Sequence, residues 1–452
     1  MNILVINGSP KGDYSITLQT SNYLAIKFPD VNFDVIHAGQ YIRKYEKDFS
    51  EAAEKIKKAD LLIFSYPVYT FLAPCQLHRF IELMKESGID FSSKFATQIS
   101  TSKHFYDVTA HRYIQQNCAD LGIKYIKGLS ADMDDLTKEK GQKEAVGFFE
   151  FVLWSMENNF YEDNTPVNTD YSPVAPATAE KTAKTLNKNV VIVTDLTEDD
   201  VQLKAMIDRF VAVFPTDCKI VNIRKYPLKG GCLGCFKCAS TGKCVYKDGF
   251  DEYLRTEIQS CDATVYAFTI KDHSMGSRFK MYDDRQFCNG HRTVTMGKPV
   301  GYIVNGKYSA EENLRMVVEG RSQVGGNFLT GVATNENNTD EQIDRLAKTL
   351  AYALENNLVM PSDFLGVGGM KIFRDLIYQM QGLMRADHKF FKSHGQYDFP
   401  QKKKGIIAAM YLVGSLTKLA DNEKVRAKMG ANMMNEGMMM PYKKIIEKAK
   451  KE

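Results

Sequence analysis

Four cysteines stand close together in the second half of this 452-residue chain, with the spacing C-x2-C-x2-C-x5-C. They are Cys232, Cys235, Cys238 and Cys244. The first three cysteines, which are separated by two residues each, can bind three irons of a cubane iron–sulfur cluster. The fourth cysteine can bind the remaining iron. Zinc is usually bound by two separated pairs of ligands, so the spacing favours a [4Fe–4S] cluster over zinc. A redox disulfide, reactive thiols and a structural turn are the alternative interpretations.

A second set of polar residues follows an apolar run at the start of the chain. Residues 7–17 read Asn-Gly-Ser-Pro-Lys-Gly-Asp-Tyr-Ser-Ile-Thr. Glycine allows a tight turn from a strand into a helix, where hydroxyl groups and free backbone N–H groups can donate to an anion. Ser9, Ser15 and Thr17 supply the hydroxyl groups, and Lys11 adds a positive charge. These features suit a phosphate group; the alternative is an ordinary turn in which Ser15 caps the helix.

Two further loops carry aromatic and polar residues at positions where predicted strands end. Residues 65–74 (SYPVYTFLAP) follow one strongly apolar run, and residues 100–106 (STSKHFY) follow the next. Because the carboxyl ends of parallel strands lie at one edge of a sheet, we expect both loops beside residues 7–17. Proline and aromatic side chains there can form a wall for a flat ring system. Three converging loops favour a binding cleft over three unrelated surface loops.

The elements that must position these residues follow a pattern that occurs twice. Residues 3–6 are matched by residues 189–192, and residues 59–60 are matched by residues 261–262. The offset grows from 186 to 202, so the second copy contains 16 additional residues. The four cysteines lie in that additional stretch. Internal repetition of this kind fixes the architecture.

Apolar runs alternate with helical periodicity in both copies, which predicts parallel strands joined by right-handed crossovers. In the first copy we expect strands at residues 2–7, 31–36, 59–66, 95–101 and 123–126. In the second copy we expect them at residues 190–193, 219–223, 263–269, 300–304 and 328–332. The prediction is therefore an α/β fold with two tandem flavodoxin-like, doubly wound parallel five-stranded sheets.

Composition divides the chain into four segments. Residues 1–160 and 189–359 are the two flavodoxin-like domains, and the second carries the four-cysteine insert. Residues 161–188 contain three prolines among Thr, Asn, Asp and Ala, which is the composition of a linker. Residues 360–452 have helical patches and an excess of Lys and Arg, which predicts a basic helical extension.

Bulk composition narrows the classes of partner and compartment. The chain has 59 Lys and Arg against 55 Asp and Glu, and this net charge of +4 does not argue for nucleic acid. We find no signal peptide, and the apolar stretch at residues 405–417 is shorter than the roughly 20 residues that span a bilayer. We therefore expect a cytoplasmic protein without a membrane partner. Nine cysteines in such a chain indicate metal or redox chemistry in place of a secreted disulfide framework.

The first copy resembles the NAD(P)H-dependent FMN reductase family. The matching residues are Gly8-Ser9-Pro10 with Ser15 and Thr17, and Pro67-Val68-Tyr69 followed by residues 76–81 (QLHRFI). The resemblance implies that the first loop binds the FMN phosphate and that the other two loops border the isoalloxazine ring. The implied contacts are Ser9, Lys11, Ser15, Ile16, Thr17, Pro67, Val68, Tyr69, Thr70, Phe71, Thr101, Ser102 and Lys103.

The second copy is similar to the iron–sulfur flavoproteins, which carry FMN and a [4Fe–4S] cluster. The cysteine spacing and residues 275–285 (MGSRFKMYDDR) carry this resemblance. One departure is large: where the first copy has Gly-Ser-Pro, residues 194–200 read Thr-Asp-Leu-Thr-Glu-Asp-Asp. Four carboxylates repel a phosphate, and residues 269–272 lack the aromatic wall. We therefore expect one FMN, in the first copy, while FMN in the second copy stays an open alternative.

These observations predict a flavin-dependent oxidoreductase. It would take electrons from NAD(P)H and pass them through FMN and the cluster to a small-molecule or protein acceptor. No side chain is needed as a catalytic acid or base, and none is assigned. The alternatives are an iron–sulfur flavoprotein electron carrier without its own substrate, and a flavin-free module that binds zinc. A homodimer that brings one chain's cluster to another chain's FMN is compatible with this fold class.

Overall fold

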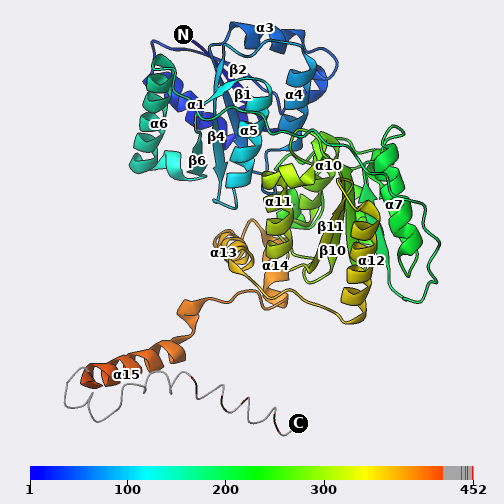
Figure 1. Ribbon diagram of the computed structural model, residues 1–452. Helices are drawn as coiled ribbons and strands as arrows, with labels where there is room; N and C mark the ends of the chain where they lie inside the picture. Colours follow the sequence, from blue (N-terminus) through cyan, green and yellow to red (C-terminus); the bar gives the residue numbers. More distant parts are fainter. Residues whose placement is uncertain (421–438, 440–442, 444, 446–449, 451–452) are drawn as a thin grey trace. The chain divides into compact units, whose positions relative to one another are not determined.

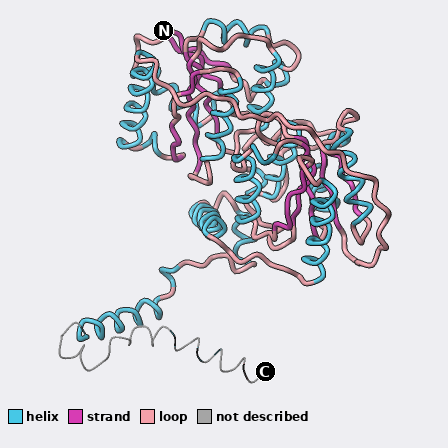
Figure 2. Tube along the Cα trace, viewed as in Figure 1, coloured by secondary structure: helices cyan, strands magenta, loops and turns pink. Residues whose placement is uncertain are grey.

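The structure is a computed structural model that describes residues 1–420, 439, 443, 445 and 450. It comprises two compact units, Met1–Phe391 and Lys392–Glu452. Both β-sheets belong to the first unit. Figure 2 shows the strands of that unit in two groups, each accompanied by helices.

The first sheet is parallel and has the strand order β2-β1-β3-β4-β5, which is the order of flavodoxin. Its strands are β1 (Asn2–Asn7), β2 (Asn32–Ile36), β3 (Leu61–Pro67), β4 (Phe95–Ser102), β5 (Lys124–Tyr125) and β6 (Leu129–Asp132). The fifth strand position is shared by β5 and β6, which both pair with β4. The segment between β5 and β6 lies against the side chain of Gln98. The approach is close at Gly128, where an added Cβ would stand 2.3 Å from Gln98 Cγ. The predicted fifth strand is therefore interrupted.

Alternate residues of β1 supply the two faces of the first sheet, as the strand period of two requires. Ile3 and Val5 pack against α1 and α6, whereas Leu4 and Ile6 belong to the core on the opposite face. The helices of this copy are α1 (Ile16–Lys27), α2 (Ile42–Tyr45), α3 (Ser50–Lys58), α4 (Cys75–Glu86), α5 (Val108–Asp120) and α6 (Glu139–Glu157). The sequence did not predict α5 or β6.

The second sheet repeats this arrangement with the order β8-β7-β9-β10-β11. Its strands are β7 (Val190–Thr194), β8 (Cys218–Asn222), β9 (Ala263–Thr269), β10 (Val300–Asn305) and β11 (Leu329–Thr334). Its helices are α7 (Val201–Val213), α8 (Lys237–Thr241), α9 (Phe250–Tyr253), α10 (Gly276–Arg285), α11 (Glu312–Val324) and α12 (Thr339–Glu355). The two parallel sheets confirm the predicted tandem flavodoxin-like repeat (Figure 1).

The repetition extends to the backbone of the loop after the third strand of each copy. Thr70 and Phe71 have φ values of 50° and 73°, and Asp272 and His273, 202 positions later, have φ values of 50° and 62°. In both loops the residue before this pair exchanges two backbone hydrogen bonds with the residue after it. The same unusual conformation is thus retained although the side chains differ.

The two copies pack against each other through equivalent helices. Helix α4 contacts α10, and α5 contacts α11. The backbone N–H of Cys75 donates to Asp284 Oδ2 at 2.7 Å, and the N–H of Ser277 donates to Glu82 Oε1 at 2.8 Å. Cys75 and Ser277 are 202 positions apart, as are Glu82 and Asp284. Reciprocal contacts of this kind define an isologous interface, so the two copies form a pseudo-symmetric pair within one chain.

The remaining segments connect and extend the two copies. Residues 160–189, all of them described, contain neither helix nor strand. After the second copy come α13 (Phe364–Gln379), α14 (Arg385–Ser393) and α15 (Lys404–Ala420), and most of the predicted extension beyond α15 lies outside the described residues. Among the described helices, none is long and apolar enough to cross a membrane.

Candidate functional site

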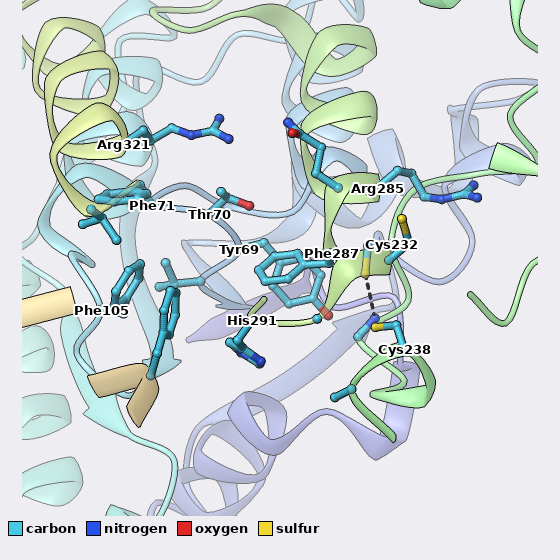
Figure 3. A pocket seen from close by; sticks show the side chains of 18 of the residues that line it. Tyr69, Thr70, Phe71, Phe105, Cys232, Cys238, Arg285, Phe287, His291 and Arg321 are labelled. Carbon is cyan, nitrogen blue, oxygen red and sulfur yellow. Dashed lines mark hydrogen bonds between the residues drawn. The ribbon is translucent and has the colours of Figure 1, made fainter. Parts of the chain in front are cut away.

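A cavity of about 410 Å³ lies where the carboxyl ends of β1, β3 and β4 meet the cysteine loop, residues 229–246 of the second copy. This volume falls within the usual range of small-molecule sites. All the predicted FMN contacts and all four cysteines line it. In Figure 3, Phe71 and Phe105 stand on one side of Tyr69, and Cys232 and Cys238 stand on the other. The structure therefore brings both predicted sites, which are more than 100 residues apart in sequence, into one cavity.

The loop after β1 is shaped by its own polar groups. Asn7 at the end of the strand donates from Nδ2 to Gly12 O at 3.0 Å and accepts from the Ser9 N–H at 3.1 Å. Gly12 has a φ of 56°, which glycine adopts without strain. Ser15 caps α1 by accepting from the Leu18 N–H at 3.4 Å. The loop therefore delivers the N-terminus of a twelve-residue helix to the cavity.

The side chains at this helix start include three hydroxyl groups and one cation. Ser9, Ser15 and Thr17 are almost fully buried, yet each lines the cavity. Lys11 also lines it and forms no salt bridge within the described residues. Burial lowers the pKa of Lys11, while the nearby Cys235 and Cys232 act in the opposite direction. A cation without a carboxylate partner, beside hydroxyl groups and a helix N-terminus, fits a phosphate.

The loop after β3 forms the aromatic wall. The Tyr69 N–H donates to Leu72 O at 2.7 Å, and the Leu72 N–H donates back at 3.1 Å. The Phe71 ring packs edge-on against Phe105 at 5.3 Å between centroids. Tyr69 in turn contacts Phe287 of the second copy at 5.9 Å. The wall is therefore fixed from both copies.

The loop after β4 closes the third side. Thr101 Oγ1 lies 2.5 Å from Thr17 Oγ1, which ties this loop to α1. The amine of Lys103 donates to Asp132 at 2.8 Å and to Asp134 at 2.9 Å. Lys103 thus lines the cavity with its charge already paired, in contrast to Lys11.

The cysteine loop reaches the cavity beside Lys11 and Tyr69. Its backbone turns through left-handed conformations at Gly234 and Phe236, and the Lys11 amine lies 5.5 Å from the Phe236 ring centroid. Cys232 Sγ accepts a hydrogen bond from the Gly234 N–H at 3.4 Å, drawn as the dashed line in Figure 3. The loop therefore lies directly against the predicted phosphate site.

Two thiols of this loop, those of Cys232 and Cys238, lie in surroundings that disfavour the thiolate. Burial raises the pKa of Cys238 to about 11, and it raises the pKa of Cys232 well above its usual range. Metals bind cysteine as the thiolate, so a bound metal would oppose this effect of burial. Within the described part of the chain, no three His, Cys, Asp or Glu side chains stand close enough together to hold a metal ion. The four cysteines share a cavity wall.

Several cavity residues were not predicted from the sequence. They come from the second copy and the C-terminal segment, and they include Phe287, His291, Arg321 and Phe373, whereas Phe105 lies in the predicted loop at residues 100–106. Phe373 of α13 stacks on Phe105 with centroids 4.7 Å apart. The sequence predicted a helical extension from residue 360, but no local signal indicates which surface α13 covers.

The equivalent loop of the second copy is filled by its own carboxylate. Asp200 accepts hydrogen bonds from the N–H and the hydroxyl of Thr197 and from the hydroxyl of Thr269, at 2.8, 2.5 and 3.0 Å. Burial raises the pKa of the neighbouring Asp195 to about 6. The N–H and hydroxyl groups that could donate to a phosphate thus already donate to the carboxylate of Asp200.

Comparison with known proteins gives one family match and several similar folds. Residues 1–130 match the family model described as NADPH-dependent FMN reductase. No curated protein matches the sequence. Solved structures similar in fold include an apo NADH:FMN oxidoreductase, 17% identical with a TM-score of 0.30, covering 36% of this chain and 91% of its own.

Two further solved structures are similar over about a third of the chain. An FMN-dependent NADH-azoreductase from Bacillus anthracis strain Ames Ancestor, in complex with FMN, is 13% identical with a TM-score of 0.27, and the alignment covers 35% of this chain and 99% of that one. An NADPH-quinone reductase from P. pentosaceus is 14% identical with a TM-score of 0.28, covering 33% and 97%. The family match therefore covers residues 1–130, and these residues include the sheet whose strand order is that of flavodoxin.

Proposed function

We propose that this protein is an NAD(P)H-dependent FMN oxidoreductase whose flavin is held by the first copy. The observation that carries the proposal is the cavity at the carboxyl ends of β1, β3 and β4, with Lys11 beside a hydroxyl-lined helix N-terminus. The first copy supplies the phosphate and ring contacts. The second copy, whose loop at Asp200 is self-capped, supplies the cysteines and the far wall.

Each group of residues has a distinct task in this proposal. Ser9, Ser15 and Thr17 donate to the phosphate, and Lys11 neutralises its charge. Residues 67–71 and 101–103 hold the flat ring against the sheet edge. FMN, when bound, supplies hydride and single-electron chemistry. The aromatic side chains of Phe105, Phe287 and Phe373 exclude water from the space next to the ring.

The proposal is tested by binding and turnover. Purified protein should quench FMN fluorescence on titration and should oxidise NADH or NADPH when an artificial electron acceptor is added. The double variant Ser9→Ala/Ser15→Ala should weaken FMN binding by at least about tenfold, because two donors to a charged group are lost. Thr197→Ala, in the self-capped loop of the second copy, is the matched control and should leave FMN affinity unchanged. Protein that binds no FMN contradicts the proposal.

We further infer that Cys232, Cys235, Cys238 and Cys244 bind a [4Fe–4S] cluster that exchanges electrons with the flavin. The spacing of the four residues supports this, and so does their position on the wall of the same cavity. The half-buried thiols of Cys232 and Cys238 would bind a cluster as thiolates, against the effect of burial on their pKa. A cluster held there would supply one-electron chemistry for an acceptor that is a small molecule or a protein.

Protein purified without oxygen distinguishes the alternatives. About four irons per chain with a broad visible absorbance shoulder, lost in Cys235→Ser, support the cluster. Zinc in place of iron, or neither metal, contradicts it while leaving the flavin proposal intact. Flavin reduction by a reduced ferredoxin-like donor, without turnover of NADH or NADPH, would instead identify an electron carrier without its own substrate.

A further inference from the structure

Lys280 is a fully buried cation with no task in the proposed function. It lies on α10 of the second copy, and its side chain has no exposed surface. Its Nζ donates to the carboxylates of Asp283 and Asp284, which are equally buried. A buried charge is strongly unfavourable unless it is paired and hydrogen-bonded, so this arrangement needs a structural or functional reason.

The third hydrogen bond of Lys280 crosses to the first copy. Nζ donates to the backbone oxygen of Tyr69 at 2.9 Å, in the loop proposed to hold the flavin ring. Its partner Asp284 accepts from the backbone N–H of Cys75, at the start of α4, at 2.7 Å. The Lys280–Asp284 pair therefore contacts the flavin loop at two points. Lys280 binds the carbonyl of Tyr69 where the loop begins, and Asp284 binds the N–H of Cys75 where α4 begins.

The loop held in this way is conformationally unfavourable. Thr70 and Phe71 lie between the two anchor points, and both have positive φ values, of 50° and 73°. Residues other than glycine adopt this region only when the surroundings impose it. A cationic donor on the Tyr69 carbonyl and a cap on α4 are contacts that the second copy adds to this loop, whereas the equivalent loop at Asp272 and His273 has the same conformation without such a cation.

The residue that corresponds to Lys280 in the first copy makes no equivalent hydrogen bond across the interface. The residue 202 positions before Lys280 is His78, which is buried and whose Nε2 has no hydrogen-bond partner in the described structure. It stacks on Tyr113 at 4.0 Å between centroids. By contrast, the helix caps made by Glu82 and Asp284 occur in both directions. The cation is thus added on the side that faces the flavin loop.

We propose that Lys280, together with Asp284, is a positioning residue for the flavin loop of the first copy, so that flavin affinity in one copy depends on the other. The inference rests on the proposed binding of FMN by residues 1–160. It assigns the second copy a task beyond carrying cysteines: a domain whose own phosphate loop is self-capped supports the loop of its neighbour.

The test uses the full chain and variants that keep the interior charge balanced. Lys280→Met/Asp284→Asn removes the cation and one anion together, so Asp283 keeps its partner Arg321. Glu82→Gln is the matched control, because it alters the pseudo-equivalent cap on Ser277 without touching the flavin loop. FMN dissociation constants come from fluorescence titration at a temperature where all proteins are folded, and melting temperatures are recorded without FMN.

The double variant should weaken FMN binding by about tenfold, because the free energy that the Lys280–Tyr69 hydrogen bond contributes to ordering the loop must then come from FMN binding. The control should stay within about twofold of the parent. A folded double variant that binds FMN as tightly as the control overturns the inference and leaves the proposed function standing. A parent protein that binds no FMN overturns both.

A milder variant keeps the inference falsifiable if the double variant fails to fold. Asp284→Asn retains Lys280 and an oxygen that can accept from Cys75, but it removes the charge that orients Nζ. We expect FMN binding that is weakened about threefold, an effect intermediate between the parent and full loss of the contact. Unchanged affinity in this variant, with a lowered melting temperature, shows a purely structural role and overturns the inference.

Discussion

Gly234 of the cysteine loop lies so close to the Tyr69 hydroxyl that a Cβ on Gly234 would stand 2.0 Å from Tyr69 Oη. The same Cβ would stand 3.3 Å from Lys11 Cε. One glycine of the second copy therefore lies against both Tyr69 of the aromatic wall and Lys11, the cation proposed to bind the phosphate. The proposed flavin and cysteine sites form one structural unit, even though separate copies of the fold encode them.

Replacing Gly234 should disrupt the contact between the cysteine loop and the aromatic wall. Gly234→Ala introduces the Cβ clash with Tyr69 and a side chain at a φ of 60°, which together should destabilise the protein by roughly 1–3 kcal/mol. FMN affinity and iron content should both fall. Gly242→Ala is the control, because its φ is 76° but its Cβ would meet only Arg292 at 3.3 Å and Ala386 at 3.9 Å. Equal effects of the two substitutions on FMN affinity would contradict the close contact.

The phosphate assignment predicts a difference between two lysines of the cavity. Lys11→Met should weaken FMN binding by about 10- to 100-fold, because a charge-assisted contact is lost, and riboflavin binding should change little. Lys103→Met should have a smaller effect on FMN affinity, because its amine already binds Asp132 and Asp134. Titration with FMN and riboflavin in parallel measures both. A similar loss for both ligands in Lys11→Met would argue against a phosphate contact.

The interface between the copies should weaken at high pH because of His273. Its Nε2 lies 2.8 Å from Asp120, and its Nδ1 lies 3.0 Å from Glu311. Burial alone would lower its pKa, but the hydrogen bonds to Asp120 and Glu311 raise it from 6.5 to about 9. Because the folded protein holds the proton more tightly, the stabilisation is complete below pH 6.5 and disappears as the pH rises through about 9.

The size of this pH effect can be bounded and measured. The shift corresponds to about 3 kcal/mol of unfolding free energy, an order-of-magnitude value. Urea unfolding between pH 6 and pH 10 should show the loss, and His273→Gln should flatten the profile over the same range. A parent profile that does not fall above pH 7 would contradict the assignment of a protonated His273.

The cavity should bind FMN within a single chain, without residues from a second copy of the protein. The residues that line it all belong to the unit Met1–Phe391, and the faces of α4 and α5 that meet α10 and α11 are buried inside that unit. We expect the FMN dissociation constant to be independent of protein concentration from nanomolar to micromolar. Affinity that rises with protein concentration would show that a second chain completes the site. The homodimer itself stays a prediction, to be measured by sedimentation.

The sequence by itself determined the elements and the edge at which function is placed. Apolar runs such as residues 2–7 and 263–269 coincide with β1 and β9, because a strand buried on both faces must be continuously apolar. Loops at the ends of parallel strands then converge by topology alone, which is why residues 9–17 and 67–71 could be grouped without a structure. Helix α5 was missed because its sequence, VTAHRYIQQNCAD, mixes polar residues into the buried face.

Only the tertiary structure decided how the two copies act on each other. The docking of α4 on α10 brings Gly234 to Tyr69 and Lys280 to the Tyr69 carbonyl, across about 165 and 211 residues of chain. Local periodicity reports which face of a helix is buried, but not which distant surface covers it. That choice depends on complementary shape and charge between the copies, as in the reciprocal caps of Glu82 and Asp284.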